Sequence, residues 1–291
     1  MTLILSCVTP DCVFQVSDRR LTWVSGPNSG QVKEDERNKA VLVNGRFSFG
    51  YTGLAEVGSV RTDNWLANVV AKSSSRDMSQ TLTAIRDSAT EAFRSINLPA
   101  EIKRHAFQGV GWVFEKGFPS AVPGVLTVSN AIGNRWEWLP AARESFDRRV
   151  ALFPTLPRGF ELMSVGQDIS DRHRRAVLRL VGRCAKHSAP PGAFLRSLLL
   201  SMRWLGGWYP TIGPSLMAVS IPKEAAEIVA RTGRMEALLA GPLGRTASFL
   251  CFGPDGRAQP YGPHAATRGI VLSNFEVLYG PPRTPSDRPP S

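Results

Sequence analysis

The chain has 291 residues, of which 43% are hydrophobic and 20% are charged, and this ordinary composition excludes a largely disordered or collagen-like protein. The formal net charge of +11 raises the question of nucleic-acid binding. The arginines are scattered along the whole sequence, however, and the one local cluster, at 172–183, has the spacing of a solvated helix face. The charge pattern therefore does not favour nucleic acid as a partner.

The location of the protein is suggested by what the sequence lacks. No run of about 18 apolar residues is present that could form a transmembrane helix, and the first residues, MTLILSCV, do not have the pattern of a signal peptide. The four cysteines, at positions 7, 12, 184 and 251, form no CxxC pair and have no histidine at zinc-binding spacing. We therefore expect a cytoplasmic protein without a membrane segment, whose cysteines are reduced core residues.

The first part of the chain predicts strands followed by helices. Alternating patterns indicate strands over 2–8 and 13–18, and a further pair over 39–43 and 47–52 surrounds the turn signal Asn44-Gly45. After Gly53 the apolar residues recur at helical spacing, over 54–71 and 78–96. Two helices are thus expected after four strands.

The remainder repeats this order. Strands are predicted over 106–115, 124–131 and 135–139, and the stretch 140–157 is predicted to be irregular. A short strand over 161–166 precedes helices over 170–187 and 191–206, and strands over 215–221 and 247–252 follow. The order predicts an α+β domain over 1–280, with two antiparallel sheets and helices on their outer faces. Residues 281–291 are rich in proline and are predicted to be a disordered tail.

The N-terminus offers the clearest catalytic chemistry. Common motifs such as GxSxG, HExxH and phosphate-binding glycine loops are absent, and the histidines have no acidic partners at ligand spacing, so no metal or cofactor is expected. Removal of Met1 would expose Thr2 as the N-terminal residue. Its α-amine, with an ordinary pKa of about 7.7 to 8.0, could accept the proton of its own hydroxyl.

Three other residues suit such a site. A fixed cation near the amine favours its neutral form, and a carboxylate keeps that cation charged. Lys39 and Asp18, at the start and the end of predicted strands, can supply these two charges. The N–H of Gly50 can approach a carbonyl group closely, which suits an oxyanion hole. Each residue also has an ordinary reading, for example Thr2 as a strand residue behind a retained Met1 and Lys39 at a strand edge.

The same residues carry a family resemblance. The segments TLILS at 2–6, VSDRRLT at 16–22, NKAV at 38–41 and FGYTGLAE at 49–56 resemble, in this order, the first quarter of proteasome β-type subunits and of the bacterial HslV peptidase. The resemblance implies an N-terminal-nucleophile hydrolase with a four-layer αββα sandwich. It implies that Thr2 is the nucleophile, that Asp18 and Lys39 tune it, that Gly50 is the oxyanion donor, and that Ser164 lies in a turn near the threonine.

The resulting hypothesis is a threonine hydrolase that cleaves an amide bond of a peptide or small amide after removal of Met1. Self-association into a homo-oligomer follows from the resemblance, because relatives form rings. An acidic residue that the family carries before a late strand has no counterpart in WYPTIG at 208–213. The alternative of a non-catalytic, proteasome-like structural or binding subunit therefore stays open.

Overall fold

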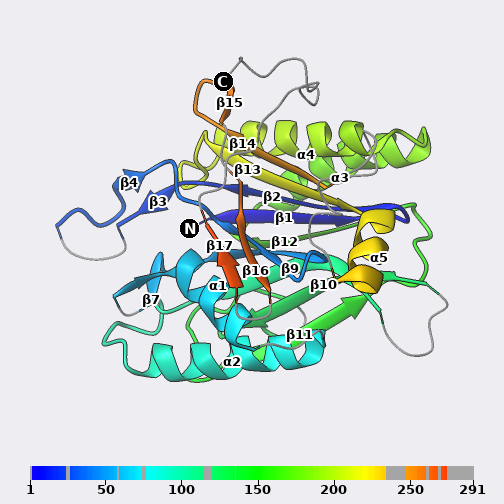
Figure 1. The fold of residues 1–291 in the computed structure, drawn as a ribbon. Coiled ribbons are helices and arrows are strands. Elements are labelled where there is room, and N and C mark those ends of the chain that lie inside the picture. The colour runs from blue at the N-terminus through cyan, green and yellow to red at the C-terminus, as the bar shows by residue number, and fades with distance from the viewer. Residues whose placement is uncertain are drawn as a thin grey trace, which may run out of the picture.

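The computed structural model describes residues 2–23, 27–57, 59–73, 77–114, 120–134, 136–233, 247–259, 262–267 and 270–273. Two large sheets lie face to face, and helices cover both outer sides, so the layers follow the order helix, sheet, sheet, helix (Figure 1). The predicted α+β four-layer fold is thereby confirmed. The predicted tail at 281–291 lies outside the described residues.

The first sheet has six strands among the described residues, and all of them are antiparallel to their neighbours. Across the sheet they are β12 (Glu161–Gly166), β1 (Leu3–Val8), β2 (Cys12–Asp18), β13 (Leu216–Pro222), β14 (Ser248–Phe252) and β15 (Ala258–Gln259). Every residue of β1 and β2 is buried, because both faces of this sheet are covered.

The second sheet has seven strands in the part of the chain that the structure describes. Its β5–β6 hairpin turns at Asn44-Gly45, where both residues have positive φ. In spatial order the strands are β11 (Asp147–Leu152), β10 (Val122–Ser129), β9 (Ala106–Val113), β6 (Phe47–Thr52), β5 (Ala40–Val43), β16 (His264–Thr267) and β17 (Ile270–Leu272). The pair β5–β16 is parallel. Two short hairpins, β3 (Leu21–Thr22) with β4 (Val32–Glu34) and β7 (Glu56–Val57) with β8 (Val60–Arg61), lie outside the large sheets.

The space between the sheets holds both apolar and polar side chains. Alternation along β1 directs Leu3, Leu5 and Cys7 toward the helices, while Val8 packs against the second sheet. Gln15 of β2 crosses the interface, where its Nε2 donates to the Gln108 carbonyl at 2.9 Å and its Oε1 accepts from the Ser48 hydroxyl at 2.9 Å. These bonds satisfy buried polar groups and fix how the two sheets face each other.

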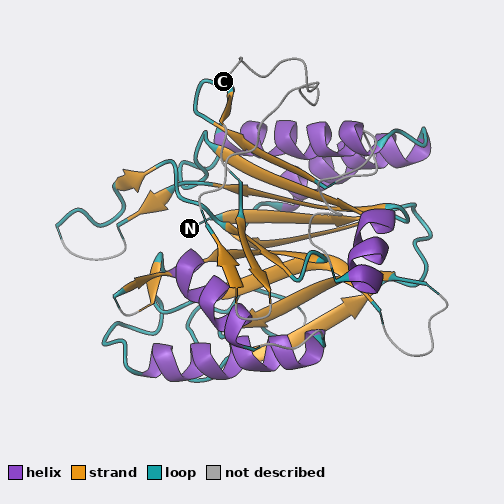
Figure 2. Cartoon of the chain, viewed as in Figure 1, coloured by secondary structure: helices purple, strands orange, loops and turns teal. Residues whose placement is uncertain are grey.

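Two pairs of helices form the two outer layers (Figure 2). Helices α1 (Thr62–Lys72) and α2 (Met78–Arg94) pack on the seven-stranded sheet, and α3 (Asp171–Lys186) and α4 (Pro191–Gly206) pack on the six-stranded sheet. The short helix α5 (Lys223–Thr232) follows β13 directly and contributes to the core between the sheets. No helix in the described ranges is long and apolar enough to span a bilayer.

Several predicted elements differ from the structure. A helix was expected to begin at residue 54, but β7 and β8 lie before it and α1 begins only at Thr62. A strand was predicted over 135–139, but in the described part of that stretch, 136–139, Trp138 makes only an isolated bridge to Ile132. Conversely, the stretch expected to be irregular contains β11, and α5, β16 and β17 were not predicted. The expectation of core cysteines is met by Cys7, Cys12 and Cys251, which are free and buried, whereas Cys184 is half-buried.

Candidate active site

The ends of three strands, β1, β2 and β5, meet at one end of the sandwich. Thr2 immediately precedes β1 and Asp18 ends β2, and antiparallel pairing places the start of one strand beside the end of the other. Lys39 immediately precedes β5 in the second sheet. The candidate residues Thr2, Asp18 and Lys39 are therefore brought together from two facing sheets, and the Asp18–Lys39 pair spans the space between them.

Asp18 is fully buried and is held by three backbone N–H groups. Its Oδ2 accepts from Leu3 at 2.8 Å, and its Oδ1 accepts from Arg20 at 3.0 Å and from Gly213 at 3.4 Å. Burial raises the pKa of Asp18 above the ordinary value, while Lys39 and the three N–H groups act to lower it. The carboxylate thus fixes the start of β1, the residue next to Thr2, while it faces Lys39.

Lys39 is also fully buried, and its ammonium group lies against Thr2. Its Nζ donates to the Thr2 hydroxyl and to the Arg20 carbonyl, and it lies 3.7 Å from Asp18 Oδ1. Burial lowers the pKa of Lys39, and the neighbouring Asp18 opposes that change. A lysine whose pKa is lowered and which contacts a hydroxyl is suited to donate to, or accept a proton from, that hydroxyl.

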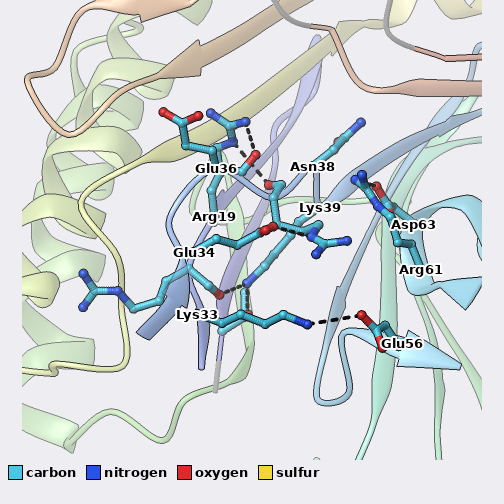
Figure 3. Close-up of polar contacts among 12 residues, drawn as sticks. Arg19, Lys33, Glu34, Glu36, Asn38, Lys39, Glu56, Arg61 and Asp63 are labelled. Carbon is cyan, nitrogen blue, oxygen red and sulfur yellow. Dashed lines mark hydrogen bonds and ion pairs between the residues drawn. The ribbon is translucent and has the colours of Figure 1, made fainter. Parts of the chain in front are cut away.

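The segment that carries Lys39 is anchored by charged side chains (Figure 3). Arg19, buried beside Asp18 in the chain, donates from Nε to the Arg37 carbonyl at 3.2 Å and from its terminal nitrogen to the Glu36 carbonyl. Arg37 in turn pairs with Glu34. These contacts hold residues 34–37 over the end of β2, and they thereby position Lys39 toward Thr2.

The backbone of Thr2 is held from both sheets by residues that the sequence did not indicate. Its carbonyl accepts from the Thr52 hydroxyl at 3.0 Å and from the Gln167 N–H at 3.0 Å. Gly166 has a φ of +105°, and a side chain there would place Cβ only 1.8 Å from the Thr2 carbonyl oxygen. Glycine is therefore required at this position. A glycine that ends a predicted strand was the only sequence signal for it.

A pocket of about 260 Å³ opens beside Thr2 and includes Gly53 in its wall. Its other lining residues are Arg20, Leu21, Thr22, Trp23, Ser29, Gly30, Ala55, Glu101, Ile102 and Arg104. Gly50, the expected oxyanion donor, lies instead inside β6 between Ala40 of β5 and Gln108 of β9, and it does not line the pocket. A residue between two paired strands directs its N–H along the sheet, whereas Gly53 follows the end of β6.

The turn at Gly53 is clamped by a buried histidine. His105 accepts a hydrogen bond from the Leu54 N–H at its Nδ1, at 3.1 Å, and burial lowers its pKa to about 3. The imidazole is therefore neutral near pH 7, as an acceptor at Nδ1 requires. With a φ of +111°, Gly53 packs so closely on Arg104 and His105 that a Cβ would lie 2.3 Å from the Arg104 carbonyl. The conformation of this turn thus depends on residues 104 and 105.

Ser164 lies farther along the strand than the resemblance implied. Ser164 is in β12 and pairs with Leu5 of β1, which is three residues after Thr2. Its side chain is exposed. Within the described ranges its hydroxyl makes no hydrogen bond to Thr2, Asp18 or Lys39. The structure therefore brings together the side chains of Thr2, Asp18 and Lys39. Gly50 lies beside the Lys39 backbone inside β6, and Ser164 lies farther along β12. No group of three or more His, Cys, Asp or Glu residues suited to a metal ion is found in the part of the chain that the structure describes.

The chain was compared with family models, with curated proteins and with solved structures. No family model matches the chain, and no curated protein matches it. Among solved structures, the chain is similar to the Anbu (ancestral beta-subunit) from Yersinia bercovieri, with a TM-score of 0.47 and 12% sequence identity, over 76% of this chain and 81% of that chain.

Proposed function

We propose that the protein is a threonine hydrolase that cleaves an amide bond, with Thr2 as its nucleophile once the Met1–Thr2 bond has been cut. The observation that carries this proposal is the contact of the Lys39 ammonium with the Thr2 hydroxyl beside a fully buried Asp18. A buried charged pair is costly unless its charges are compensated. The Lys39–Asp18 pair lies against the Thr2 hydroxyl at the wall of a pocket, and a charged pair in this position can activate the hydroxyl as a nucleophile.

In the proposed reaction the Thr2 oxygen attacks the carbonyl carbon of the substrate amide. The free α-amine of Thr2 accepts the hydroxyl proton and passes it to the leaving amine, and water then hydrolyses the ester that remains on Thr2. Lys39 donates to the attacking oxygen and stabilises its developing negative charge. Asp18 keeps Lys39 in place and fixes Leu3 next to the nucleophile.

We assign the oxyanion donor of this proposal to the N–H of Gly53 in place of Gly50. Gly53 lines the pocket together with Thr2, and its turn is held by the bond from Leu54 to His105. The volume of about 260 Å³ is small for a site that encloses a whole ligand. It fits one side chain of a peptide or a small amide, and both substrate classes remain within the proposal.

Intact mass and covalent labelling test the proposal together. The purified protein is expected to have lost every residue before Thr2 and to gain the full mass of a β-lactone probe at its hydroxyl. Thr2→Ala is expected to abolish labelling and to lower hydrolysis by at least ~10³-fold while the fold is kept. Thr22→Ala, at another threonine of the same pocket, is the matched control and is expected to label normally.

The opposite outcome supports the non-catalytic alternative. A protein that keeps Met1, resists the probe and is indifferent to Thr2→Ala would be a structural or binding subunit with this fold. Self-association is a further part of the proposal that rests on the resemblance of the N-terminal motifs. Native mass spectrometry tests it, with a homo-oligomer as the expected result and a monomer at all concentrations as the contradicting one.

A further inference from the structure

A second hollow lies on the outer helical layer, away from Thr2. It has a volume of about 440 Å³ and lies between the segment before β12 and one side of α3. Its lining residues are Arg158, Phe160, Arg175, Leu178, Arg179 and Gly182. None of them lines the pocket at Thr2, so the hollow is separate from the candidate active site.

Three arginines surround this hollow, and none of them has an acidic partner among the residues that the structure describes. Arg175 and Arg179 are exposed and lie one helical turn apart on α3, and Arg158 faces them from the preceding segment. Within the described part of the chain, no ion pair joins any of the three to a carboxylate. Arg175 donates a hydrogen bond from Nε to the Asp171 carbonyl of the same helix, at 3.3 Å. Like charges four residues apart destabilise a helix, so the fold alone gives no reason for this grouping.

Gly182 gives an independent indication that the hollow is kept open. It lies in the interior of α3, where glycine favours the helix less than every residue except proline. Crowding does not explain it, because a Cβ there would make only ordinary contacts, at 3.6 Å from Cε1 of Phe160. Its φ is also not positive. The absent side chain leaves space over the Phe160 ring, between the arginines.

We propose that this hollow binds a small phosphorylated molecule. Guanidinium groups donate in pairs to phosphate oxygens, and the three positive charges here are enough to neutralise a phosphate monoester, whose charge is near −2 at neutral pH. A carboxylate, with one charge and two oxygens, would leave most of these donors unused. Phe160, Leu178 and Gly182 form an apolar floor for the remainder of the ligand, and the volume lies within the range of small-molecule sites.

Isothermal titration calorimetry, which measures the affinity of two probes for the full chain, tests the proposal. Phenyl phosphate carries the phosphate on an apolar ring, and inorganic phosphate lacks the ring. The expected result is that phenyl phosphate binds at least tenfold more tightly than inorganic phosphate, because only it reaches the apolar floor. Arg175→Gln and Arg179→Gln are each expected to weaken phenyl phosphate binding at least tenfold. Gly182→Leu is expected to block it, and the two surface variants keep the test valid if that variant fails to fold.

Arg174→Gln is the matched control, because Arg174 is exposed on the same helix and does not line the hollow. This variant is expected to bind phenyl phosphate as the unchanged protein does. An equal loss in Arg174→Gln would reveal general attraction to a basic protein and overturn the proposal. Equal affinity for the two probes, or no binding of either, would overturn it as well. The proposal would also be overturned if the protein bound a duplex oligonucleotide and replacement of each arginine of α3 weakened that binding equally. That result would identify a nucleic-acid surface.

Discussion

Replacing Lys39 by methionine tests whether the buried pair with Asp18 organises the site. Methionine keeps most of the side-chain volume and removes the ammonium group, so Asp18 is left as a fully buried carboxylate without a cation. Breaking a buried pair in this way costs about 3 to 5 kcal/mol. Asp18 keeps its bonds from the N–H groups of Leu3, Arg20 and Gly213. We therefore expect a loss near the lower end, about 3 kcal/mol at neutral pH.

The loss is expected to depend on pH, with a sign that follows from the two groups. Burial already raises the pKa of Asp18, and removal of Lys39, the largest influence lowering it, raises that pKa further. A carboxyl group with a raised pKa binds more protons in the folded state, so the free energy of unfolding falls as pH rises through that window. Lys39 contributes to the same pH dependence. Its pKa is lowered in the folded state, so the unfolded chain binds more protons below 10.5, and the unchanged protein becomes more stable as pH rises toward that value. The deficit of the variant is thus larger at about pH 8 than at about pH 5.

Urea unfolding followed by far-UV circular dichroism at these two pH values measures both the loss and its pH dependence. Labelling of Thr2 by the β-lactone, measured under folded conditions, should be abolished at both. An equal deficit at the two pH values would refute the argument that Asp18 becomes an unpaired buried carboxylate. Normal labelling of Lys39→Met would refute the argument that the ammonium group activates the hydroxyl.

Two further predictions concern the groups that hold the site. Gly166→Ala should lower the free energy of unfolding by more than about 2 kcal/mol, because its Cβ would overlap the Thr2 carbonyl. Gly159→Ala is the control for backbone strain alone, because Gly159 has a φ of +73° but its nearest contact is at 3.4 Å. This variant should lower the free energy of unfolding by about 1 kcal/mol. The folded-state pKa of His105 is about 3 against 6.5, so the unfolded chain binds more protons between these values and stability should fall by about 1.4 kcal/mol per pH unit as pH drops through that window. His105→Asn, which keeps an acceptor for Leu54, should remove this dependence in acid unfolding curves, and an unchanged slope would contradict the assignment.

The sequence predicted those parts of the fold whose pattern is local. The β1–β2 and β5–β6 hairpins follow from alternation and from the Asn44-Gly45 turn, and α4 has the predicted bounds. The strand β11 was missed because it is an edge strand with charged residues, Asp147 to Arg149, in its alternating pattern. The parallel pairing of β16 with β5 joins segments more than two hundred residues apart, and no local pattern contains such a contact.

The candidate site was predicted in the same uneven way. Thr2, Asp18 and Lys39 were identified by their chemistry, and the structure places them in contact. The backbone groups were not accessible to the same reasoning. Gly50 and Gly53 are equally flexible as residues, and only the pairing of β6 with both neighbours distinguishes the glycine inside the sheet from the one at its end. Gly166 is required by one close approach to Thr2, which depends on the register of β1 with β12.

The contacts of Thr2 explain why the site and the packing of the two sheets depend on each other. Its carbonyl is held by Thr52 at the end of β6 and by Gln167 after β12, one from each sheet. Its hydroxyl is held by Lys39 of the second sheet, which faces Asp18 of the first. A shift of one sheet against the other by one ångström would separate these partners, since a hydrogen bond weakens steeply beyond its normal length. The bonds of Gln15 across the sheets, although distant from Thr2 in the chain, therefore help to set the position of its hydroxyl.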